Sequence, residues 1–253
     1  MIANKLKTLF RRSHKNTGQT APDPRTRIHF LHIGKCAGNQ VGHVAEFINS
    51  VSTDRKIIKH GHDVFLRNLP EEEPYFFSIR SPISRFYSGF YSRKRMGMPL
   101  IHSKWTACEK FAFDHFPEAN DLAEALFSDG DLGYEAVGAM NSIRHTSQNQ
   151  IGWFYCAGAF LVTRPPIYIL RQENFEADLN KFLILANLHT YASQVPISTD
   201  KVTAHANDYS KTPPLSQKAK DNLKRWYVQD LAFYDMCSAW LDACEAPPRT
   251  SGL

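Results

Sequence analysis

The sequence predicts a single α/β domain with a mostly parallel central sheet and helices on both of its faces. Apolar strand-like runs alternate with helical patterns along the chain, which is typical of βαβ units. Two of these strands are followed by a turn and a helix start of the kind that binds phosphate. The chain has 253 residues, enough for one sizeable core and too few for two independent cores.

The predicted domain covers residues 27–245 and lies between two short flanking segments. Residues 1–26 are polar and basic and contain Pro22 and Pro24, so we expect a flexible leader. Residues 246–253 form a C-terminal tail. The leader lacks an apolar stretch of signal-peptide length and no later segment approaches a membrane span, so we expect no integral membrane segment.

The charge balance is mildly basic, with 30 Lys and Arg residues against 25 Asp and Glu residues. This balance suits an anionic cofactor and an anionic glycan, and it falls short of the dense basic stripe of a nucleic-acid-binding protein. The five cysteines include no C-x-x-C pair, so we expect no metal site. Their odd number favours a reducing compartment, with one or two disulfides as an open alternative.

Residues 28–40, IHFLHIGKCAGNQ, combine an apolar strand, a glycine-containing turn and the start of a helix. Gly34 and Gly38 allow a tight turn, the helix start attracts anions, and Lys35 adds a mobile charge inside the loop. We therefore predict a phosphate-binding loop made of Gly34, Lys35, Cys36, Ala37, Gly38, Asn39 and Gln40. An ordinary strand-turn-helix with a solvated lysine stays open as the alternative.

A magnesium-dependent kinase or ATPase is the rival interpretation of this loop. Its pattern G-x-x-x-x-G-K-[ST] is absent, since Lys35 precedes the second glycine and Cys36 stands where a magnesium-binding hydroxyl is required. The pattern therefore disfavours a P-loop nucleotide kinase. We keep that kinase as the alternative function, together with a non-catalytic module that binds glycans or nucleotides.

Residues 76–95, FFSIRSPISRFYSGFYSRKR, repeat the arrangement of strand, turn and helix. Arg80 stands at the end of the strand, and Pro82 suits the first turn of a helix. Arg85 and Ser88 follow at helical spacing. Arg80 and Ser88 are therefore predicted to bracket a second phosphate.

Apolar residues at regular intervals predict a short strand at 56–60 and two short helices within 103–128. Trp105, Phe111 and Phe113 fall in the first of these helices. Aromatic side chains at such spacing usually face the interior, so we expect these three in the core rather than on a sugar platform.

The second half predicts a strand at 167–170 followed by a helix at 175–185, with Asn174 as a candidate helix cap. Residues 215–241 carry apolar side chains at helical intervals. We expect one long amphipathic helix there that packs on the sheet.

The two motifs resemble those of a known enzyme family. HIGKCAGNQ resembles the HIPKTAGTS-type 5′-phosphosulfate loop of sulfotransferases that use 3′-phosphoadenosine-5′-phosphosulfate (PAPS), and IRSPISRFYSGFY resembles their R-D-P-x-x-R-x-x-S 3′-phosphate motif. The chain looks most like the carbohydrate sulfotransferases related to the heparan 2-O- and 6-O-enzymes, from residue 28 to about 241. The resemblance implies PAPS as the donor, a carbohydrate or glycoconjugate hydroxyl as the acceptor, no metal, and a Lys35 that neutralises charge on the leaving phosphate.

The chain departs from the family pattern at several positions. Gly34 replaces the usual proline, and Ser81 replaces the usual aspartate. Cys36, Asn39 and Gln40 stand where hydroxyl residues commonly contact the 5′-phosphate, although the two amides can still donate hydrogen bonds. Eukaryotic relatives are usually anchored in the Golgi by an N-terminal helix, so we expect a cytoplasmic, bacterial enzyme, with a truncated form from the Golgi lumen as the alternative.

The resemblance also implies a catalytic histidine between the two phosphate motifs. Relatives of the 6-O type place it in an H-x-D-W-like context, which His62 and Asp63 match, and His60 is the reserve candidate. Histidine titrates near neutrality and can accept the proton of the attacking hydroxyl. A surface histidine in a loop is the open alternative.

Residues 141–150, NSIRHTSQNQ, resemble the N-x-x-x-x-Q-T-like region that borders the acceptor in this family. Arg144, His145 and Gln148 are therefore the expected acceptor-binding residues, and Trp153 is a candidate floor for a sugar ring. A plain polar loop explains the same residues as an alternative.

Residues 196–214 are rich in polar and turn-forming residues. Relatives carry a basic, asparagine-containing loop here that closes over the 3′-phosphate, so Lys201 and Lys211 are candidates for that lid. Solvated lysines are the alternative.

Overall fold

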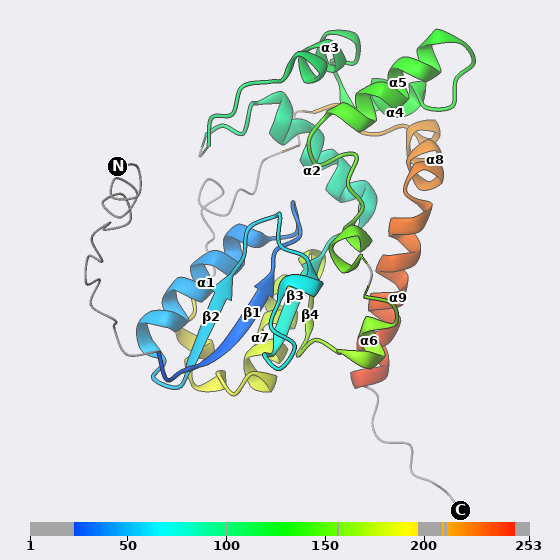
Figure 1. Cartoon of the computed structure of the whole chain (residues 1–253). Coiled ribbons are helices and arrows are strands. Elements are labelled where there is room, and N and C mark those ends of the chain that lie inside the picture. The colour runs from blue at the N-terminus through cyan, green and yellow to red at the C-terminus, as the bar shows by residue number, and fades with distance from the viewer. Residues whose placement is uncertain (1–22, 100, 156, 197–208, 210–211, 246–253) are drawn as a thin grey trace, which may run out of the picture.

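The computed structural model of the chain describes residues 23–99, 101–155, 157–196, 209 and 212–245 (Figure 1). Four strands form one sheet: β1 (Thr26–Leu31), β2 (Arg55–Lys59), β3 (Tyr75–Ile79) and β4 (Ile169–Arg171). All three neighbouring pairs are parallel, and the strand order is β2-β1-β3-β4. The predicted α/β fold with a parallel central sheet is therefore confirmed.

Helices supply most of the remaining described structure. The α-helices are α1 (Gly38–Val51), α2 (Pro82–Lys94), α3 (Ala107–His115), α4 (Ala119–Ala125), α5 (Asp131–Ser142), α6 (Phe160–Thr163), α7 (Phe175–Leu185), α8 (Gln217–Trp226) and α9 (Val228–Glu245). Four short 3₁₀ segments are also described: η1 (Leu66–Asn68), η2 (Gln150–Phe154), η3 (Gln172–Asn174) and η4 (His189–Gln194).

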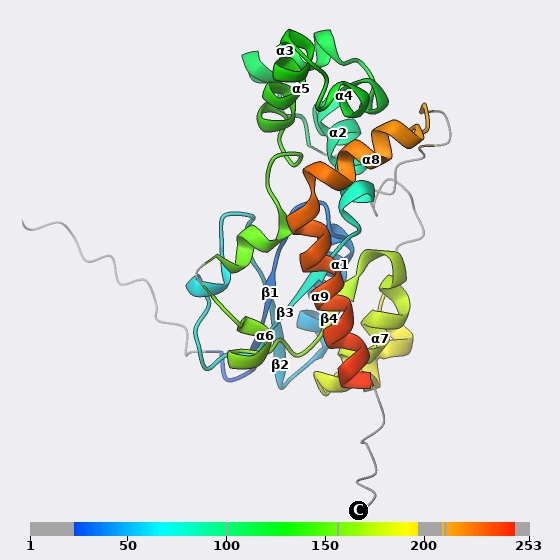
Figure 2. The ribbon, with the colours of Figure 1, turned by 90° about the vertical axis from the view of Figure 1, so that its right-hand side faces the viewer.

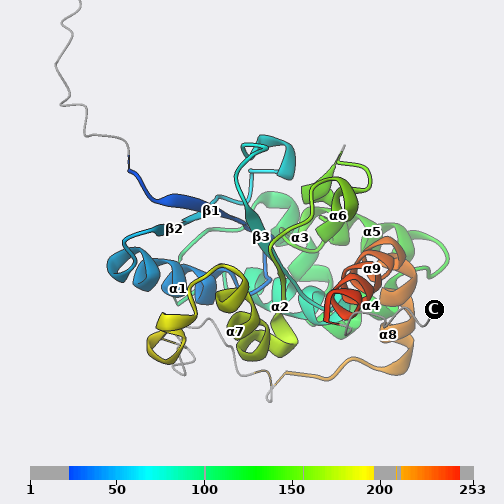
Figure 3. The ribbon, with the colours of Figure 1, turned by 90° about the horizontal axis from the view of Figure 1, so that it is seen from below.

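Helices cover both faces of the sheet, as consecutive residues of β3 demonstrate. Phe76 stacks on Phe182 of α7 with ring centroids 4.1 Å apart, whereas Phe77 contacts Phe154 of η2 at 4.6 Å and Phe160 of α6. Because successive side chains of a strand point to opposite faces, α7 covers one face and η2 with α6 covers the other. Figure 3 shows α1 beside α7 on the first of these sides. The expected arrangement of helices on both faces is confirmed.

A second apolar cluster lies beyond the carboxyl end of the sheet. It is formed by α2, α3, α4, α5 and α8, whose aromatic and aliphatic side chains pack around the buried Phe86 and Phe90. Helix α2 and the successive helices α8 and α9 run from this helical cluster to the sheet (Figures 1 and 2). Phe233, Cys237 and Leu241 of α9 belong to the apolar core around the sheet. The preceding helix, α8, packs on the helical cluster instead.

The C-terminal helix predicted as one continuous element is two helices that meet at Tyr227. The hydroxyl of this buried residue donates to the carbonyl of Thr146 at 2.6 Å, which anchors the turn. Asn174 occupies the N-cap position of α7 as predicted, but its side chain makes no capping hydrogen bond, because its amide donates to Asp178 (3.1 Å).

The three aromatic residues expected in the core have different environments. Phe113 is buried, and Trp105 packs partly against the helical cluster. Phe111 is 48% exposed and stacks on His115 along the outer face of α3. The core prediction is therefore wrong for Phe111, since the apolar stripe of this short helix is narrower than the pattern indicates.

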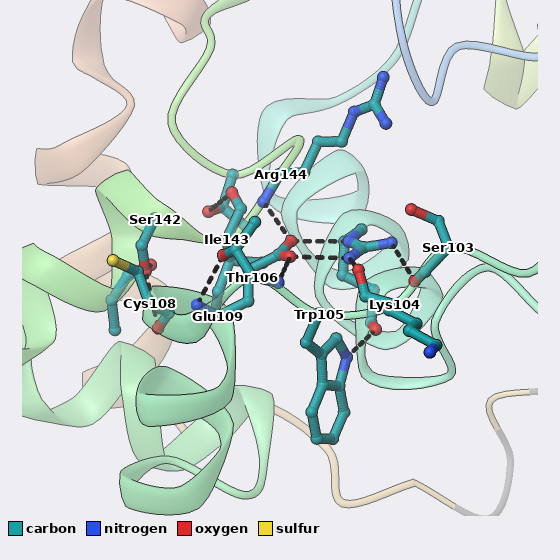
Figure 4. A network of polar contacts seen from close by, with 12 residues as sticks. Ser103, Lys104, Trp105, Thr106, Cys108, Glu109, Ser142, Ile143 and Arg144 are labelled. Carbon is teal, nitrogen blue, oxygen red and sulfur yellow. Dashed lines mark hydrogen bonds and ion pairs between the residues drawn. The ribbon is translucent and has the colours of Figure 1, made fainter.

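A buried ion pair ties α2 and α3 to the segment that follows α5 (Figure 4). The guanidinium of Arg93 donates from Nε and Nη2 to the two carboxylate oxygens of Glu109, each at 2.7 Å. Glu109 also accepts from the backbone N–H groups of Thr106 (3.0 Å) and Arg144 (3.2 Å). The helical cluster thereby holds the backbone of Arg144 in place, while the side chain of Arg144 points away from the network (Figure 4).

No helix within the described part of the chain has the length and apolar character needed to cross a membrane. The lid candidates Lys201 and Lys211 lie outside the described residues.

Candidate phosphate-binding site

The loop between β1 and α1 lies at the carboxyl end of a central strand. Lys35 (φ 69°) and Ala37 (φ 58°) both adopt the left-handed conformation, which is uncommon for residues with a side chain. The chain then enters α1 at Gly38, whose first turn has backbone N–H groups without partners inside the helix. This geometry is typical of anion-binding loops in α/β proteins.

Gly38 is required by a histidine that the loop covers. A Cβ atom at this position would lie 1.7 Å from Nε2 of His32, whose buried ring fills the space beside the helix start. His32 Nδ1 in turn contacts the backbone oxygen of His60 at 3.2 Å. Because Gly38 has no Cβ atom, the imidazole of His32 can pack directly against the first turn of α1.

Replacing Gly38 with alanine is expected to destabilise the protein by about 1–3 kcal/mol, because the imidazole of His32 has to move from a packed position. Urea unfolding measures this change. The matched control is Gly138→Ala in α5, where an added Cβ meets nothing within 4 Å. The control is expected to be neutral or stabilising by up to about 1 kcal/mol, and equal midpoints for the two variants would contradict the role of His32.

Arg80 follows β3 and reaches back to this loop. Its Nη1 donates to the carbonyl of Lys35 (3.5 Å), and its Nε donates to Ser84 (2.8 Å) on the first turn of α2. Ser88 lies one turn further along the same helix and is nearly buried. Helix α2 begins at Pro82 as predicted. The two predicted phosphate motifs are thus adjacent, and Arg80 joins them.

Positive charge accumulates at the loop. Burial lowers the pKa of Lys35 to about 8, and the charges of Arg80, Arg95 and Arg85 contribute to the shift. Burial also lowers the pKa of Arg80. Nη2 of Arg85 and Nε of Arg95 are buried without a hydrogen-bond partner among the described residues. A site with several neighbouring cations and with buried donors that lack partners suits a ligand that carries several negative charges.

Arg85 links the loop to the segment that precedes η2. Its Nε donates to the carbonyl of Gly34 (2.9 Å) and its Nη1 to the carbonyl of Gln148 (2.7 Å). Its guanidinium lies 5.9 Å from the ring of Trp153, which is fully buried. The prediction that Trp153 lies under a sugar is therefore wrong, because this ring supports an arginine inside the core. The side chain of Gln148 is exposed.

His62 lies near the loop, and one of its two ring nitrogens is hydrogen-bonded to the backbone. Its Nδ1 lies 3.1 Å from the backbone oxygen of His32. A carbonyl only accepts, so Nδ1 carries the proton and Nε2 keeps its lone pair. Burial lowers the pKa of His62, the hydrogen bond to His32 opposes this, and the charges of Arg144, Lys59 and Lys35 lower it further. His62 is thus held as a neutral imidazole beside a cationic loop.

His145 also lies beside Gly34. A Cβ added to Gly34 would lie 3.1 Å from Nδ1 of His145 and 3.7 Å from Nδ1 of His62, and the two rings are 6.1 Å apart in an edge-to-face arrangement. Burial lowers the pKa of His145 to about 2, with Lys35 and Arg85 contributing. A proline at position 34 would press against His145, which gives the glycine a physical reason.

His60 has a different environment. Its Nε2 lies 2.8 Å from Nδ1 of His29, and the other nitrogen of His29 contacts Glu73. The structure therefore brings His62 and His145 to Gly34, whereas the ring of His60 is engaged by His29.

The side chain of Cys36 points into the core. Its Sγ donates to Oε1 of Gln150 at 3.2 Å, and burial raises its pKa to about 12, so the thiol is neutral. Its carbonyl accepts from the hydroxyl of Ser78. Only the main chain of Cys36 is left to meet a phosphate. Asn39 and Gln40 are half-buried on the first turn of α1.

Sequence reasoning missed two buried residues behind the loop, Gln150 and Asp230, both fully buried. Gln150 follows the polar run 141–149 and looks like one more surface amide. Asp230 carried a signal, because a carboxylate stands on the same helical face as the apolar residues Tyr227 and Tyr234. A charge on a buried face is a candidate for a structural or functional network.

Within the described ranges, no group of three or more His, Cys, Asp or Glu side chains is arranged to hold a metal ion. Among the described residues, Cys36, Cys108 and Cys237 are free thiols. In comparisons with known proteins, the chain matches no family model and no curated sequence.

Proposed function

We propose that this protein is a sulfotransferase that moves a sulfuryl group from PAPS to a hydroxyl of a carbohydrate acceptor. One observation carries the proposal: Arg80 at the end of β3 donates to the carbonyl of Lys35 in the loop after β1. The two segments that resemble the 5′- and 3′-phosphate motifs therefore lie next to each other at the carboxyl end of the parallel strands, as one donor site would require. Open α/β sheets bind their ligands at this end.

The residues present fit an anionic donor. The cations of Lys35, Arg80 and Arg85 lie together, and the buried Nη2 of Arg85 has no partner in the described structure. In the proposal, the backbone of residues 34–38 and Lys35 hold the 5′-phosphosulfate, and Arg80 with Ser88 holds the 3′-phosphate. PAPS supplies the activated sulfuryl group when it is bound.

The protein contributes proton transfer and charge stabilisation. Nε2 of His62 accepts the proton of the acceptor hydroxyl, since Nδ1 is committed to His32. The ammonium of Lys35 stabilises the charge that develops on the departing 5′-phosphate. Holding donor and acceptor in line supplies much of the remaining acceleration.

The surroundings of His62 suit this role. The side chain of Arg144 is exposed to solvent. The positive charges of Arg144 and Lys59 both lower the pKa of His62. Burial first, and these cations in addition, lower the pKa of His62, which favours the unprotonated imidazole that a general base requires. Arg144 and His145 then face the acceptor. A kinase is disfavoured by the inward thiol of Cys36, which supplies no hydroxyl for magnesium.

Calorimetric titration with adenosine 3′,5′-bisphosphate in the absence of magnesium tests the proposal. The unmodified protein is expected to bind. Arg80→Ala is expected to weaken binding about 10- to 100-fold, because a charged hydrogen bond contributes roughly 1.5–3 kcal/mol. Arg225→Ala is the matched control, since Arg225 is exposed on α8 and lies over the exposed ring of Phe127.

The outcomes separate the candidate functions. Failure of the unmodified protein to bind adenosine 3′,5′-bisphosphate overturns the sulfotransferase. Binding of ATP that depends on magnesium supports the kinase. Binding of the bisphosphate without transfer to any glycan from radiolabelled PAPS supports a non-catalytic nucleotide-binding relative.

A further inference from the structure

The side chain of Gln150 lies between the two phosphate motifs. Its Oε1 accepts from the backbone N–H of Arg80 (2.9 Å) and from the thiol of Cys36 (3.2 Å). Its Nε2 donates to the carbonyl of Arg80 at 2.8 Å. The amide therefore pairs with both backbone groups of Arg80, as a neighbouring strand would, and one oxygen atom joins the two motifs.

Asp230 on α9 determines which way this amide faces. Its carboxylate accepts from the backbone N–H of Gln150 (2.6 Å), from Nε2 of Gln150 (3.2 Å) and from the N–H of Ile151 (3.4 Å). An ionised carboxylate only accepts, so the NH₂ group of Gln150 has to face it. In a flipped amide, the NH₂ group of Gln150 would face the N–H of Arg80, and the amide oxygen would face the carboxylate of Asp230. Both contacts would be repulsive.

The ionised form of Asp230 has local support despite its burial. Burial raises its pKa, and the charge of Arg85 and the hydrogen bonds from Gln150 and Ile151 act in the opposite direction. Buried polar groups are costly unless they are fully bonded, so a network of this kind specifies one arrangement.

We propose that Gln150, oriented by the buried carboxylate of Asp230, is the positioning residue that holds Arg80 for the 3′-phosphate of the donor. The inference rests on the proposed function. Arg80 follows the last residue of β3, and its guanidinium has to span from Ser84 to the carbonyl of Lys35. With both backbone groups of Arg80 held by one amide, the side chain starts from a fixed position and loses less conformational entropy on binding.

The consequence is specific to the 3′-phosphate. Selectivity is the affinity for adenosine 3′,5′-bisphosphate divided by that for adenosine 5′-monophosphate, which lacks this group. Gln150→Met keeps the length of the side chain and removes the amide. It is expected to lower the selectivity about 5- to 10-fold, the effect of roughly one hydrogen bond. In Asp230→Asn, the new NH₂ group of the asparagine faces the NH₂ group of Gln150. This variant is therefore also expected to lower the selectivity.

The experiment is calorimetric titration of both nucleotides into five forms of the protein: unmodified, Gln150→Met, Asp230→Asn, Arg80→Ala, and the double variant of Gln150→Met with Arg80→Ala. A residue that acts through Arg80 has no further effect on selectivity once Arg80 is gone. A residue that merely stabilises the fold lowers the unfolding midpoint in urea without changing selectivity. A sixth form, Asp235→Asn, is the control, because Asp235 is an exposed aspartate on the same helix α9.

Amide hydrogen exchange on the unmodified protein gives a second measurement that needs no variant. The N–H of Arg80 is bonded to a buried amide, whereas the N–H of Ser81 is bonded to the exposed carboxylate of Glu173. We expect the N–H of Arg80 to exchange more slowly than that of Ser81. Equal exchange of the two overturns the inference even if the variants fail to fold.

The remaining outcomes are distinguishable. Unchanged selectivity in a folded Gln150→Met overturns the inference and leaves the proposed function standing. A further loss of selectivity in the double variant beyond Arg80→Ala also overturns it, since Gln150 would then act independently. If the unmodified protein does not bind adenosine 3′,5′-bisphosphate, the proposed function fails and the inference fails with it.

Discussion

Lys35→Ala is expected to lower the rate of sulfuryl transfer about 100- to 1,000-fold, the effect of removing one preorganised group that stabilises developing charge. The ammonium is the cation within the loop itself, and the left-handed backbone at this residue directs the chain around the proposed 5′-phosphate position. The rate is measured with radiolabelled PAPS and a glycan acceptor found by screening. Lys110→Ala is the control, because Lys110 is exposed on α3 and pairs with Asp114.

The pKa of Lys35 adds a pH dependence to this prediction. Burial and neighbouring arginines lower it to about 8, so the side chain is charged below that pH and loses its charge above it. We therefore expect kcat/KM, which reports the free enzyme, to fall as the pH rises above about 8. Lys35→Arg keeps the charge at alkaline pH and is expected to remove this limb. An unchanged alkaline limb in Lys35→Arg would assign it to another group.

His62→Asn is expected to lower the transfer rate about 100- to 10,000-fold, the range for removing a general base. Asparagine can still donate from its amide to the carbonyl of His32, but it cannot take up a proton. Binding of adenosine 3′,5′-bisphosphate is expected to stay within about 3-fold of the unmodified protein, since a group that acts in the transition state contributes little to ground-state binding. The two measurements together separate a base from a residue that shapes the donor site.

His60→Asn is the matched comparison for His62. Its ring is bonded to His29, so the transfer rate is expected to change less than about 10-fold, much less than for loss of a general base. The pKa of His62 lies below its ordinary value, so the base stays unprotonated at slightly acidic pH. The rate is expected to hold from neutrality through pH 6.5 and to fall in stronger acid, as Nε2 takes up a proton. A larger loss in His60→Asn than in His62→Asn would reverse the assignment.

Much of the architecture could be predicted from local patterns. The strands at β1, β2, β3 and β4 fall within a few residues of their predicted positions, because apolar runs bounded by turns identify buried parallel strands. The start of α2 at Pro82 followed from the fixed φ of proline. The proximity of the two phosphate motifs followed from parallel strands whose carboxyl ends meet at one side of the sheet.

The remainder depended on contacts between distant parts of the chain. Gln150 and Arg80 are 70 residues apart, and Gln150 and Asp230 are 80 apart, so no local pattern announces that they meet. At the break between α8 and α9, the hydroxyl of Tyr227 donates to the carbonyl of Thr146, which lies 81 residues away in the sequence. The prediction that Phe111 lies in the core was wrong, because helical spacing alone does not show how wide a face of α3 is covered by the rest of the protein.

The strand order also protects the sheet against association with other copies of itself. The two central strands β1 and β3 are paired on both sides, so within the described part of the chain β2 and β4 are the strands at the edges of the sheet. β4 has three residues, which is a short template, and β2 carries Arg55, Lys56 and Lys59 in its five. Short edge strands and charged side chains at an edge resist the addition of a foreign strand. The fold that gathers the cations of the site at one end of the sheet thus also makes its sides poor nuclei for aggregation.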